Sequence, residues 1–351
     1  MEPKPFYQSV PFLVLASILF PPAGIILLWA RSGTDSINKI VGTIAIVALG
    51  AGYAVALSAM GILPSPFVKN PEMDAHYSEL EQHRARQRET SAEAPAAPES
   101  APQPAEQPDA SAAAATPAVA SPAAPKVART YWTDYRGPNR DGRYDELKVL
   151  SEWPASGPRM LWRQPVGGGY ASFVVAEGVA YTIEQRRAQE VVAAYDVESG
   201  RELWTHGWDA SFVESMGGDG PRATPTWNQG RLYALGATGE LRCLDAKTGK
   251  LLWGRNILTD NRATNLDWGM AASPLVVDDK VIVLPGGQSG RSVVAYNKQT
   301  GEPVWRSLDD RQAYVSPILA TLGGQRQIVV VTSRRVVGLA IENGDMLWEY
   351  P

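Results

Sequence analysis

The sequence predicts an all-β protein, a β-propeller of four-stranded antiparallel blades, preceded by two transmembrane α-helices and a disordered linker. Three observations support this fold: a phrase with glycine and tryptophan that recurs after residue 190, a row of hydroxyl residues with the same period, and two uncharged stretches near the amino terminus. A period of this size is typical of modules that bury their hydrophobic faces only by stacking on a neighbour.

Residues 1–69 predict a membrane hairpin. Its two helices, residues 10–30 and 40–62, carry no charge and are each long enough to cross a hydrocarbon core of about 30 Å. Pro21 and Pro22 predict a kink in the first helix. A cleaved signal peptide is the alternative, but its apolar core normally runs only about 7 to 15 residues and here a second span follows.

The basic residues around the hairpin predict its orientation. Arg31 and Lys39 lie in the turn between the two helices, whereas Lys4 precedes the first helix and Lys69 follows the second. The excess of lysine and arginine favours the cytoplasmic side for the turn. This orientation places both the amino terminus and the repeats outside the cytoplasm.

Residues 70–128 predict a tether between the membrane and the repeats. Residues 72–90 are charged and predict a short exposed helix, whereas residues 91–126 consist almost wholly of Ala, Pro, Ser and acidic side chains. Such a composition cannot bury enough apolar surface to fold, and its prolines favour an extended chain. The second part of the tether is therefore predicted to be a disordered spacer that binds nothing.

Residues 129–351 predict the propeller repeats. In the unit 222–255, four short strands alternate with glycine-bearing turns, which is the pattern of one antiparallel blade. Three other units repeat the pattern, each with glycine in the third turn, where a positive φ is expected, and tryptophan in the outermost strand. The repeat residues are Trp162, Trp204, Trp253, Trp305 and Trp348, spaced 42 to 52 residues apart, with Gly200, Gly249, Gly301 and Gly344.

A second row of residues supports the same register. Each innermost strand begins beside a small hydroxyl residue, 29 or 32 residues before the repeat tryptophan of the same unit. The row consists of Ser172, Thr224, Ser273 and Ser316. Two rows that share one period make a chance repeat implausible.

The pattern A-x-D-x-x-T-G-x-x-x-W resembles the tryptophan-docking repeat of the pyrroloquinoline quinone (PQQ)-like propeller family. This family includes PQQ dehydrogenases and the non-enzymatic outer-membrane assembly lipoprotein BamB. The segment YWTDYRGPNRDGRYDE (131–146) and the phrases GPRATPT, WGMAASPLVV and VLPGG resemble bacterial BamB-like members. The resemblance covers residues 130–351 and implies a ring of seven or eight blades. Together with the hairpin, it implies a bacterial inner-membrane protein with its propeller in the periplasm.

The number of blades predicts a fragment of such a ring. Four complete units are visible, and the strand 159–166, which contains Trp162, has no inner partners before it. In a closed ring, strands from the carboxyl end would supply these partners and remove the open edge. A genuine four-bladed ring is the alternative.

Composition excludes several function classes. The net charge of -4 indicates no basic surface for phosphates, so no nucleic-acid partner is expected. The single cysteine, Cys243, excludes a disulfide framework and a cysteine-based zinc site, and its alternating setting predicts a buried small hydrophobe. No G-x-S-x-G, H-E-x-x-H or Walker A motif indicates a hydrolase.

The resemblance implies that a ligand would lie in the central tunnel, beside the loops that lead into the innermost strands. Arg222, Asp267 and Trp268 are the candidates for contact with a cofactor, and the alternative is that they satisfy loop backbone and pack between blades. No metal-binding set is predicted, and the segment 137–146 is read as a strap over the propeller because it lacks the ligand positions of an EF-hand. The other polar and aromatic loop residues are Tyr170, Asp309, Asp310 and Tyr314.

The predicted function is a membrane-anchored, extracytoplasmic scaffold that binds a protein or polymer partner at the loop face and needs no cofactor. The alternative is a quinoprotein dehydrogenase that oxidises an alcohol or sugar with PQQ and Ca²⁺. The alcohol dehydrogenase branch carries adjacent cysteines beside the quinone, and Cys243 has no cysteine neighbour. This departure weakens the dehydrogenase alternative but leaves open PQQ enzymes of the glucose dehydrogenase type, which lack that pair. The scaffold is favoured mainly because the residues of a cofactor site cannot be assembled from this sequence.

Overall fold

The computed structural model describes residues 10–31, 34–59, 71–93, 131–145, 148–149, 151–214 and 216–351. The predicted Ala/Pro-rich spacer therefore lies mostly outside the described residues. The chain forms two compact units, Met1–Ala75 and His76–Pro351. Each unit is described by itself.

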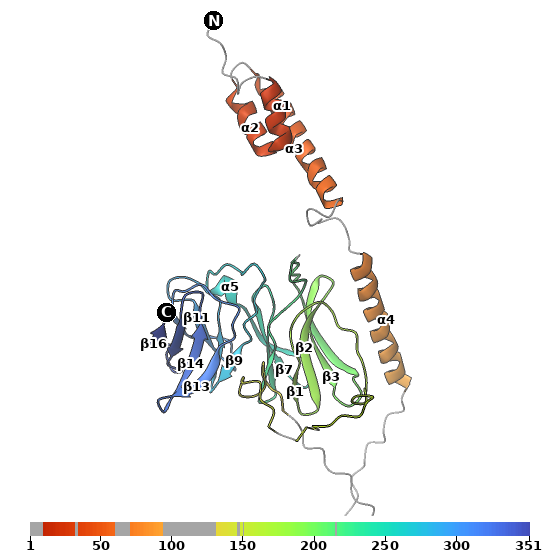
Figure 1. Ribbon diagram of the computed structural model, residues 1–351, viewed down its shortest axis with the longest axis vertical. Coiled ribbons are helices and arrows are strands. Elements are labelled where there is room, and N and C mark those ends of the chain that lie inside the picture. The colour runs from red at the N-terminus through yellow and green to blue at the C-terminus, as the bar shows by residue number, and fades with distance from the viewer. Residues whose placement is uncertain are drawn as a thin grey trace, which may run out of the picture. The chain divides into compact units, whose positions relative to one another are not determined.

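Before Ala59, the described residues of the amino-terminal unit form three helices, labelled in Figure 1: α1 (Val10–Leu19), α2 (Pro21–Ala30) and α3 (Ser36–Ala59). The stretch predicted to be one kinked helix is broken at Phe20 into two helices of ten residues each. The break follows from Pro21 and Pro22, which cannot donate backbone hydrogen bonds to α1 but suit the first turn of a new helix. Neither short helix reaches the roughly 20 residues that a membrane span requires.

The three helices of this unit pack closely where glycine removes a side chain. A Cβ atom at Gly24 would overlap Ser17, and one at Gly42 would lie 2.7 Å from Leu28 Cδ2. Within the described residues, only α3, over Ser36–Tyr53, is long and apolar enough to cross a membrane. The predicted pair of spans is therefore not confirmed.

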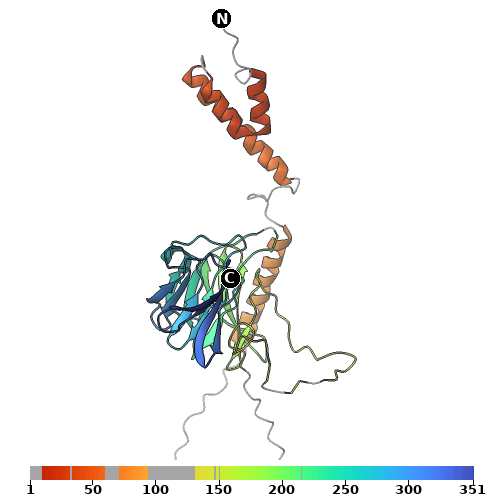
Figure 2. The ribbon, with the colours of Figure 1, turned by 60° about the vertical axis from the view of Figure 1, so that its left-hand side comes forward.

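The second unit begins within α4 (Pro71–Glu93), a helix that lies alongside the sheets in both views (Figure 1, Figure 2). The sequence predicted a helix here, but an exposed one. Tyr77, Leu80 and Arg84 are instead buried, each 7% exposed or less. They follow one another at intervals of three and four residues, so they share one face of the helix.

The remainder of this unit consists of four antiparallel sheets, each with four strands in sequence order. The predicted four-stranded blades of a β-propeller are thus confirmed. Blade 1 comprises β1 (Val174–Ala176), β2 (Val179–Arg186), β3 (Gln189–Asp196) and β4 (Glu202–Asp209), and blade 2 comprises β5 (Thr226–Asn228), β6 (Arg231–Leu235), β7 (Glu240–Asp245) and β8 (Leu251–Asn256). Blade 3 comprises β9 (Leu275–Val277), β10 (Lys280–Val283), β11 (Val293–Asn297) and β12 (Pro303–Ser307), and blade 4 comprises β13 (Ile318–Leu322), β14 (Gln325–Val331), β15 (Val336–Leu339) and β16 (Met346–Tyr350). The short helix α5 (Ile257–Asp260) follows β8.

The hydrophobic cores lie between neighbouring blades. Along β2, Tyr181 and Ile183 point toward blade 2 and pack with Leu232 and Leu244. Equivalent clusters join blade 2 to blade 3 and blade 3 to blade 4. Side chains alternate between the two faces of a strand, so each central blade contributes one set of residues to each neighbour.

The repeat tryptophans join each blade to the next. The indole of Trp204, in blade 1, donates a hydrogen bond to the Ala246 carbonyl of blade 2, with 3.1 Å between Nε1 and O. Its ring lies over Gly249, whose φ is +71°, and a Cβ atom there would be 2.5 Å from the ring. The same pairing links Trp162 with Val197 and Gly200, Trp253 with Lys298 and Gly301, and Trp305 with Ile341 and Gly344.

Trp348 is different because its indole turns onto its own blade. Its Nε1 atom donates to the side-chain amide of Gln327, and its ring covers Gly338. Trp162, by contrast, docks onto blade 1 from a segment that lies outside the four sheets.

The row of hydroxyl residues links the beginnings of the innermost strands. The amide of Ser172 donates to Thr224 Oγ1 at 3.0 Å, the amide of Thr224 to Ser273 Oγ at 2.9 Å, and the amide of Ser273 to Ser316 Oγ at 2.9 Å. The hydroxyl groups of Thr224, Ser273 and Ser316 thus each satisfy a backbone donor of the preceding blade. The row that marked the register in the sequence is a continuous chain of hydrogen bonds across all four blades.

The segment 131–145 lies over the innermost strands as a strap. Trp132 pairs with Val175 through backbone hydrogen bonds, and the Trp227 amide donates to the Thr133 carbonyl. Arg140 is buried and donates to the carbonyls of Ser273, Pro274 and Pro317, to Thr226 Oγ1 and to Asp134. One side chain of the strap therefore connects blades 2, 3 and 4.

Candidate functional site

A cleft of about 420 Å³ opens beside the strap and the loops that lead into the innermost strands. Aromatic and arginine side chains dominate its lining, and none of the described lining residues carries a carboxylate. The lining residues are Tyr135, Arg136, Arg140, Tyr170, Arg222, Ala271, Tyr314, Val315, Ser316 and Ile318. The strap contributes three of these residues, Tyr135, Arg136 and Arg140, and the sequence did not predict that contribution.

Arg222, a predicted ligand contact, lies in the wall of the cleft. Its guanidinium donates to the carbonyls of Gly218 and Gly220, so it closes the loop that precedes it. It also packs against two rings, 4.6 Å from the centroid of Phe212 and 5.6 Å from that of Tyr170. These contacts hold the cation in one position at the surface of the cleft.

The pKa of Arg222 is lowered from its usual value by burial, and the nearby Tyr170, Glu214 and Asp219 oppose the shift. The two carboxylates lie outside the cleft lining. Arginine stays charged in proteins even when its pKa falls. The wall of the cleft therefore keeps a fixed cation beside an aromatic ring.

The structure separates the other two predicted contacts. Trp268 is half-exposed and packs against Tyr314, with 5.3 Å between the ring centroids, and its amide donates to Tyr314 Oη at 3.2 Å. Trp268 therefore supports a lining residue from the rim. Asp267 is exposed and is not part of the cleft lining.

The remaining loop acids occupy other positions. Asp310 is buried and pairs with Arg335 at 2.7 Å, which ties the loop before β13 to the loop before β15. Asp309 accepts a hydrogen bond from the Gly290 amide at 2.5 Å. It lines a second cavity, of about 540 Å³, together with Arg262 and Arg311.

The cleft does not offer the ligand set of a calcium ion. Calcium takes about six to eight oxygen ligands, most often from carboxylates and carbonyls. Across the described ranges, no three His, Cys, Asp or Glu side chains lie close enough to hold a metal ion. Cys243 is fully buried, and burial raises the pKa of its thiol, which suits a core residue.

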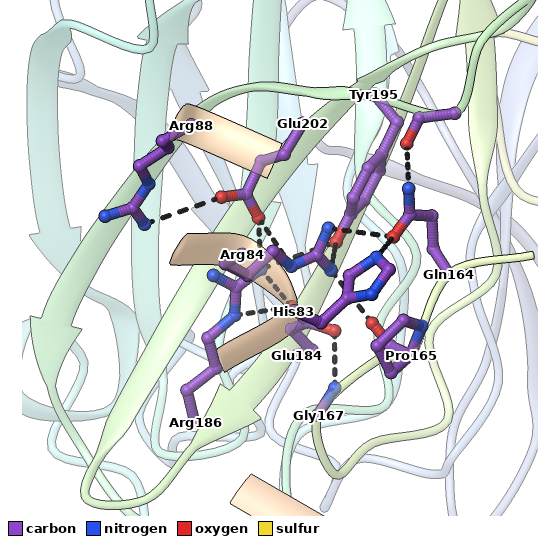
Figure 3. A network of polar contacts seen from close by, with 11 residues as sticks. His83, Arg84, Arg88, Gln164, Pro165, Gly167, Glu184, Arg186, Tyr195 and Glu202 are labelled. Carbon is purple, nitrogen blue, oxygen red and sulfur yellow. Dashed lines mark hydrogen bonds and ion pairs between the residues drawn. The ribbon is translucent and has the colours of Figure 1, made fainter. Parts of the chain in front are cut away.

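A second cluster of polar residues joins α4 to blade 1, and sequence reasoning did not predict it. Figure 3 shows the Arg84 guanidinium at its centre. Arg84 Nη2 donates to the Pro165 carbonyl at 2.9 Å and to Tyr195 Oη at 2.8 Å, and the cation lies 4.9 Å from the centroid of the Tyr195 ring. Its Nε atom lies 3.3 Å from Glu202 Oε2, an ion-pair distance without hydrogen-bond geometry.

Two carboxylates and a second arginine complete this cluster. Arg186 lies 2.5 Å from Glu184 Oε1 and 2.7 Å from Glu202 Oε2, and the Gly167 amide donates to Glu184. Burial works against the charge of Arg186, but Glu184 and Glu202 outweigh it and raise its pKa. Burial and the charge of Glu184 raise the pKa of Tyr195, so its hydroxyl stays protonated at neutral pH. The only sequence signal for the cluster was the spacing of Tyr77, Leu80 and Arg84 in a charged segment.

The family model described as outer membrane protein assembly factor BamB matches residues 142–270 and 187–351. The chain belongs to this family. The predicted resemblance to PQQ-like propellers is thereby confirmed.

Curated relatives of the chain include both enzymes and an assembly factor. A quinohemoprotein alcohol dehydrogenase, ADH-IIG of Pseudomonas putida, is 28% identical over 175 residues, which are 47% of this chain and 23% of the relative. BamB of Bordetella pertussis is 24% identical over 165 residues, 47% of this chain and 37% of the relative. The chain thus spans about a quarter of the dehydrogenase and just over a third of BamB.

Solved structures show the same two groups. The P. putida ADH-IIG structure has a TM-score of 0.39 at 19% identity, with 52% of this chain and 34% of that chain covered. The crystal structure of BamB from Moraxella catarrhalis has a TM-score of 0.35 at 16% identity, with 53% and 63% covered.

Proposed function

We propose that the propeller is a binding scaffold whose loop-face cleft takes a protein partner. The observation that carries the proposal is the cleft lining, which combines Tyr135, Tyr170 and Tyr314 with Arg136 and Arg222. Tyrosine, tryptophan and arginine dominate the energetic centres of protein interfaces. Membership of the BamB family supports the same function.

The exposure of these side chains fits a docking surface. Tyr170 is 64% exposed, Trp268 46% and Tyr314 39%. Their loops are anchored by Arg222, Arg140 and the hydroxyl row, so a partner would meet aromatic rings that are already ordered. Ordering before binding reduces the entropy cost of association.

A cofactor titration tests the scaffold against the dehydrogenase. The full chain is mixed with PQQ and Ca²⁺, and its absorbance spectrum and dye-linked turnover with alcohols and sugars are recorded. The scaffold predicts neither a saturable quinone spectrum nor turnover. Saturable binding with turnover would refute the scaffold.

The alternative function is PQQ-dependent oxidation of an alcohol or sugar. The curated quinoprotein dehydrogenases among its relatives favour it, and so does the cationic wall of the cleft. In that function, Arg222 and Trp268 would contact the cofactor. No group of three His, Cys, Asp or Glu side chains among the described residues is placed to hold the Ca²⁺ of such an enzyme.

We further propose that the chain is anchored in a bacterial inner membrane with its propeller in the periplasm. The apolar length of α3 supports the anchor, and the lysine and arginine residues between the two apolar stretches support the orientation. A periplasm-dependent reporter fused after residue 128 should be active. Activity of a cytoplasmic reporter at that position instead would reverse the orientation.

A further inference from the structure

The second cavity, of about 540 Å³, is formed by blades that have a neighbour on each side or by the loops between them. Its lining residues lie in the loop after α5, in the loop between β10 and β11, and in the loop between β12 and β13. Blade 3 therefore lies at its centre, and this blade packs against blade 2 and against blade 4. The described blades supply the whole of this lining.

The second cavity lies at the same end of the blades as the cleft. In an antiparallel blade, the loop that leads into the first strand and the loop between the second and third strands share one end. Arg311 lines the second cavity and Tyr314 lines the cleft, and the two residues lie in the same loop, before β13. A partner that lies across this loop reaches both.

Two glycines bring the loops of the cavity together. A Cβ atom at Gly287 would overlap the Asn261 carbonyl oxygen, and one at Gly286 would lie 2.7 Å from the Gln312 amide nitrogen. The φ of Gly286 is +72°, which favours glycine. These glycines end the phrase VLPGG of the sequence. They let the loop between β10 and β11 pack directly on the loops to either side, so the walls of the cavity are held in place.

Arg262 and Arg311 supply the positive charge of the cavity. Both side chains are exposed, and neither guanidinium has a hydrogen-bond acceptor or an ion-pair partner in the described part of the chain. Arg335 differs, because it pairs with Asp310 and Glu349. Two unpaired guanidinium groups in one cavity attract an anion.

The donors of the cavity favour a carboxylate. The amides of Gly286 and Gly287 already donate to the carbonyls of Ser292 and Arg291. Sites for phosphate commonly rely on free backbone amides of this kind. Recognition in this cavity falls instead to guanidinium groups, whose planar fork matches a carboxylate with two parallel hydrogen bonds.

Asp309 is the one acidic side chain among the lining residues. It accepts a hydrogen bond from the Gly290 amide at 2.5 Å, which holds it on the loop between β10 and β11. One carboxylate offsets part of the charge of two guanidinium groups but does not cancel it. Asp309 therefore weakens the attraction for an anion, and its removal should strengthen it.

We propose that the second cavity is a carboxylate-binding site, which takes acidic side chains of the protein partner that docks in the cleft. This inference rests on the proposed function, because it specifies the chemistry of the same partner. Arg262 and Arg311 bind the carboxylates of the partner, while the tyrosines of the cleft contact the adjoining part of its chain. The partner segment is thus acidic at one end and apolar or aromatic at the other.

Calorimetric titration of the full chain, in a non-ionic detergent, with the peptide tetraglutamate tests the site. Tetraglutamate should bind, and the uncharged peptide tetraglutamine should not. Raising NaCl to about 0.3 M should weaken binding, because salt screens exposed charges. Failure of tetraglutamate to bind at low salt would refute the carboxylate site.

Substitutions of the two arginines locate the binding. Arg262→Met and Arg311→Met should each weaken tetraglutamate binding about three- to tenfold, because each removes charge-assisted hydrogen bonds that water partly replaces. Arg311→Lys should also weaken it, since lysine keeps the charge but lacks the fork. Binding by Arg311→Lys as tight as by the wild type would contradict recognition through a guanidinium fork.

Arg201→Met is the matched control. Arg201 is an exposed arginine in the third turn of blade 1, at the end of the blades opposite the cavity. Its removal changes the net charge by the same amount and should leave tetraglutamate binding within about twofold of the wild type. Equal effects of Arg201→Met and Arg311→Met would show that the peptide binds by overall charge alone.

Asp309→Asn tests the site in the opposite direction and remains informative if an arginine variant does not fold. Asparagine can keep the hydrogen bond with Gly290 while it removes a like charge from the lining. Tetraglutamate should bind this variant about two- to fivefold more tightly than the wild type. Unchanged or weaker binding would place the peptide outside the cavity.

Two small anions test the source of the carboxylate. Glutarate and inorganic phosphate should bind at least about threefold more weakly than tetraglutamate, because several carboxylates on one chain can occupy both guanidinium groups at once. Equal or tighter binding of either anion would assign the cavity to a small molecule and overturn the protein source.

The cofactor titration separates this inference from the proposed function. Turnover with PQQ by a chain that also binds tetraglutamate would refute the scaffold and leave the carboxylate site in place. A chain that binds neither the quinone nor tetraglutamate would refute the carboxylate site and leave the scaffold in place.

Discussion

At the scale of single residues, the repeat glycines and tryptophans together form the contacts between neighbouring blades. Glycine supplies the positive φ of the third turn and leaves room for a ring, and the ring supplies the contact with the next blade. Gly249 shows both requirements, with φ of +71° and the Trp204 ring 2.5 Å from where a Cβ atom would lie. The tryptophan of one blade and the turn glycine of the next therefore form the contact between them, although each copy of the sequence pattern lies within one pair of strands.

Gly249→Ala should destabilise the protein more than Gly230→Ala. Gly230 has a similar φ, +76°, but nothing lies within 4 Å of a Cβ atom there. Gly230→Ala should therefore lose stability only through the unfavourable backbone conformation. Overlap with Trp204 should add about 1–3 kcal/mol to the loss in free energy of unfolding. Urea denaturation of both variants measures this difference. Equal losses would show that the indole can shift without cost.

At the scale of the structural element, the third turn explains why the repeat phrase contains Asp and Thr. Asp245 Oδ1 accepts hydrogen bonds from the Thr248 amide at 2.9 Å and from its hydroxyl at 2.7 Å. Asp196 does the same with Ser199 in blade 1. In blade 3, Asn297 supplies the equivalent oxygen to the Thr300 amide. An oxygen at this position closes the turn before glycine reverses the chain.

The carboxylate in this turn predicts a dependence of stability on pH. The hydrogen bond from the Thr248 side chain lowers the pKa of Asp245 below its usual value. A lowered pKa in the folded state stabilises the protein above the unfolded pKa, about 3.9, and this contribution is lost as the pH falls through the folded pKa. The wild type should thus lose more stability than Asp245→Asn between pH 5 and pH 2.5, as measured by urea denaturation.

Asn297→Asp is the complementary test of this turn. It should acquire the same loss of stability at low pH, because it places a carboxylate where the Thr300 and Gln299 amides donate. If the free energy of unfolding of Asn297→Asp depended on pH in the same way as that of the wild type, the turn would not lower the pKa of its carboxylate enough to affect stability.

At the scale of the whole propeller, three sets of specific contacts join the blades in addition to the hydrophobic cores between them. Tryptophans connect the outer strands, hydroxyl groups connect the inner strands, and Arg140 of the strap connects the inner strands of blades 2, 3 and 4. Arg140 is paired with Asp134, and burial raises the pKa of Asp134 against the effect of that arginine. Because the pair is buried, removing either partner would leave the charge of the other uncompensated.

Arg140→Met should lower the free energy of unfolding by about 3–5 kcal/mol, because it leaves a buried carboxylate unpaired and removes donors from several carbonyls. Arg136→Met, on the exposed part of the same strap, should cost less than about 0.5 kcal/mol. Chemical denaturation followed by tryptophan fluorescence measures both. A small loss for Arg140→Met would show that the strap is not part of the folding unit.

The arrangement of the blades could be predicted because its determinants are local. Each unit of about 50 residues contains its own alternating strands, turn glycine and hydroxyl residue, and every unit repeats these signals. The first membrane stretch was predicted less well. Two prolines were expected to kink one helix, whereas they end α1 and begin α2.

The candidate site was only partly predictable. Arg222, which precedes an innermost strand, lies in the wall of the cleft, whereas Asp267 in an equivalent position is exposed outside it. The direction of a loop side chain depends on which neighbours fill the space around it. Tyr135 and Arg136 reach the cleft from the strap, and no local pattern in the strap indicates where it crosses the blades.

The sequence by itself determined the blades, their register and the joints between them, because a repeated local pattern specifies each unit and its nearest neighbour. Only the tertiary structure decided which distant segments complete the surface. It placed Arg140 among three inner strands and Arg84 in a pocket on blade 1, 111 residues from Tyr195 along the chain. The physical reason is that a buried arginine is stable only where several acceptors converge, and these acceptors come from segments far apart in the sequence.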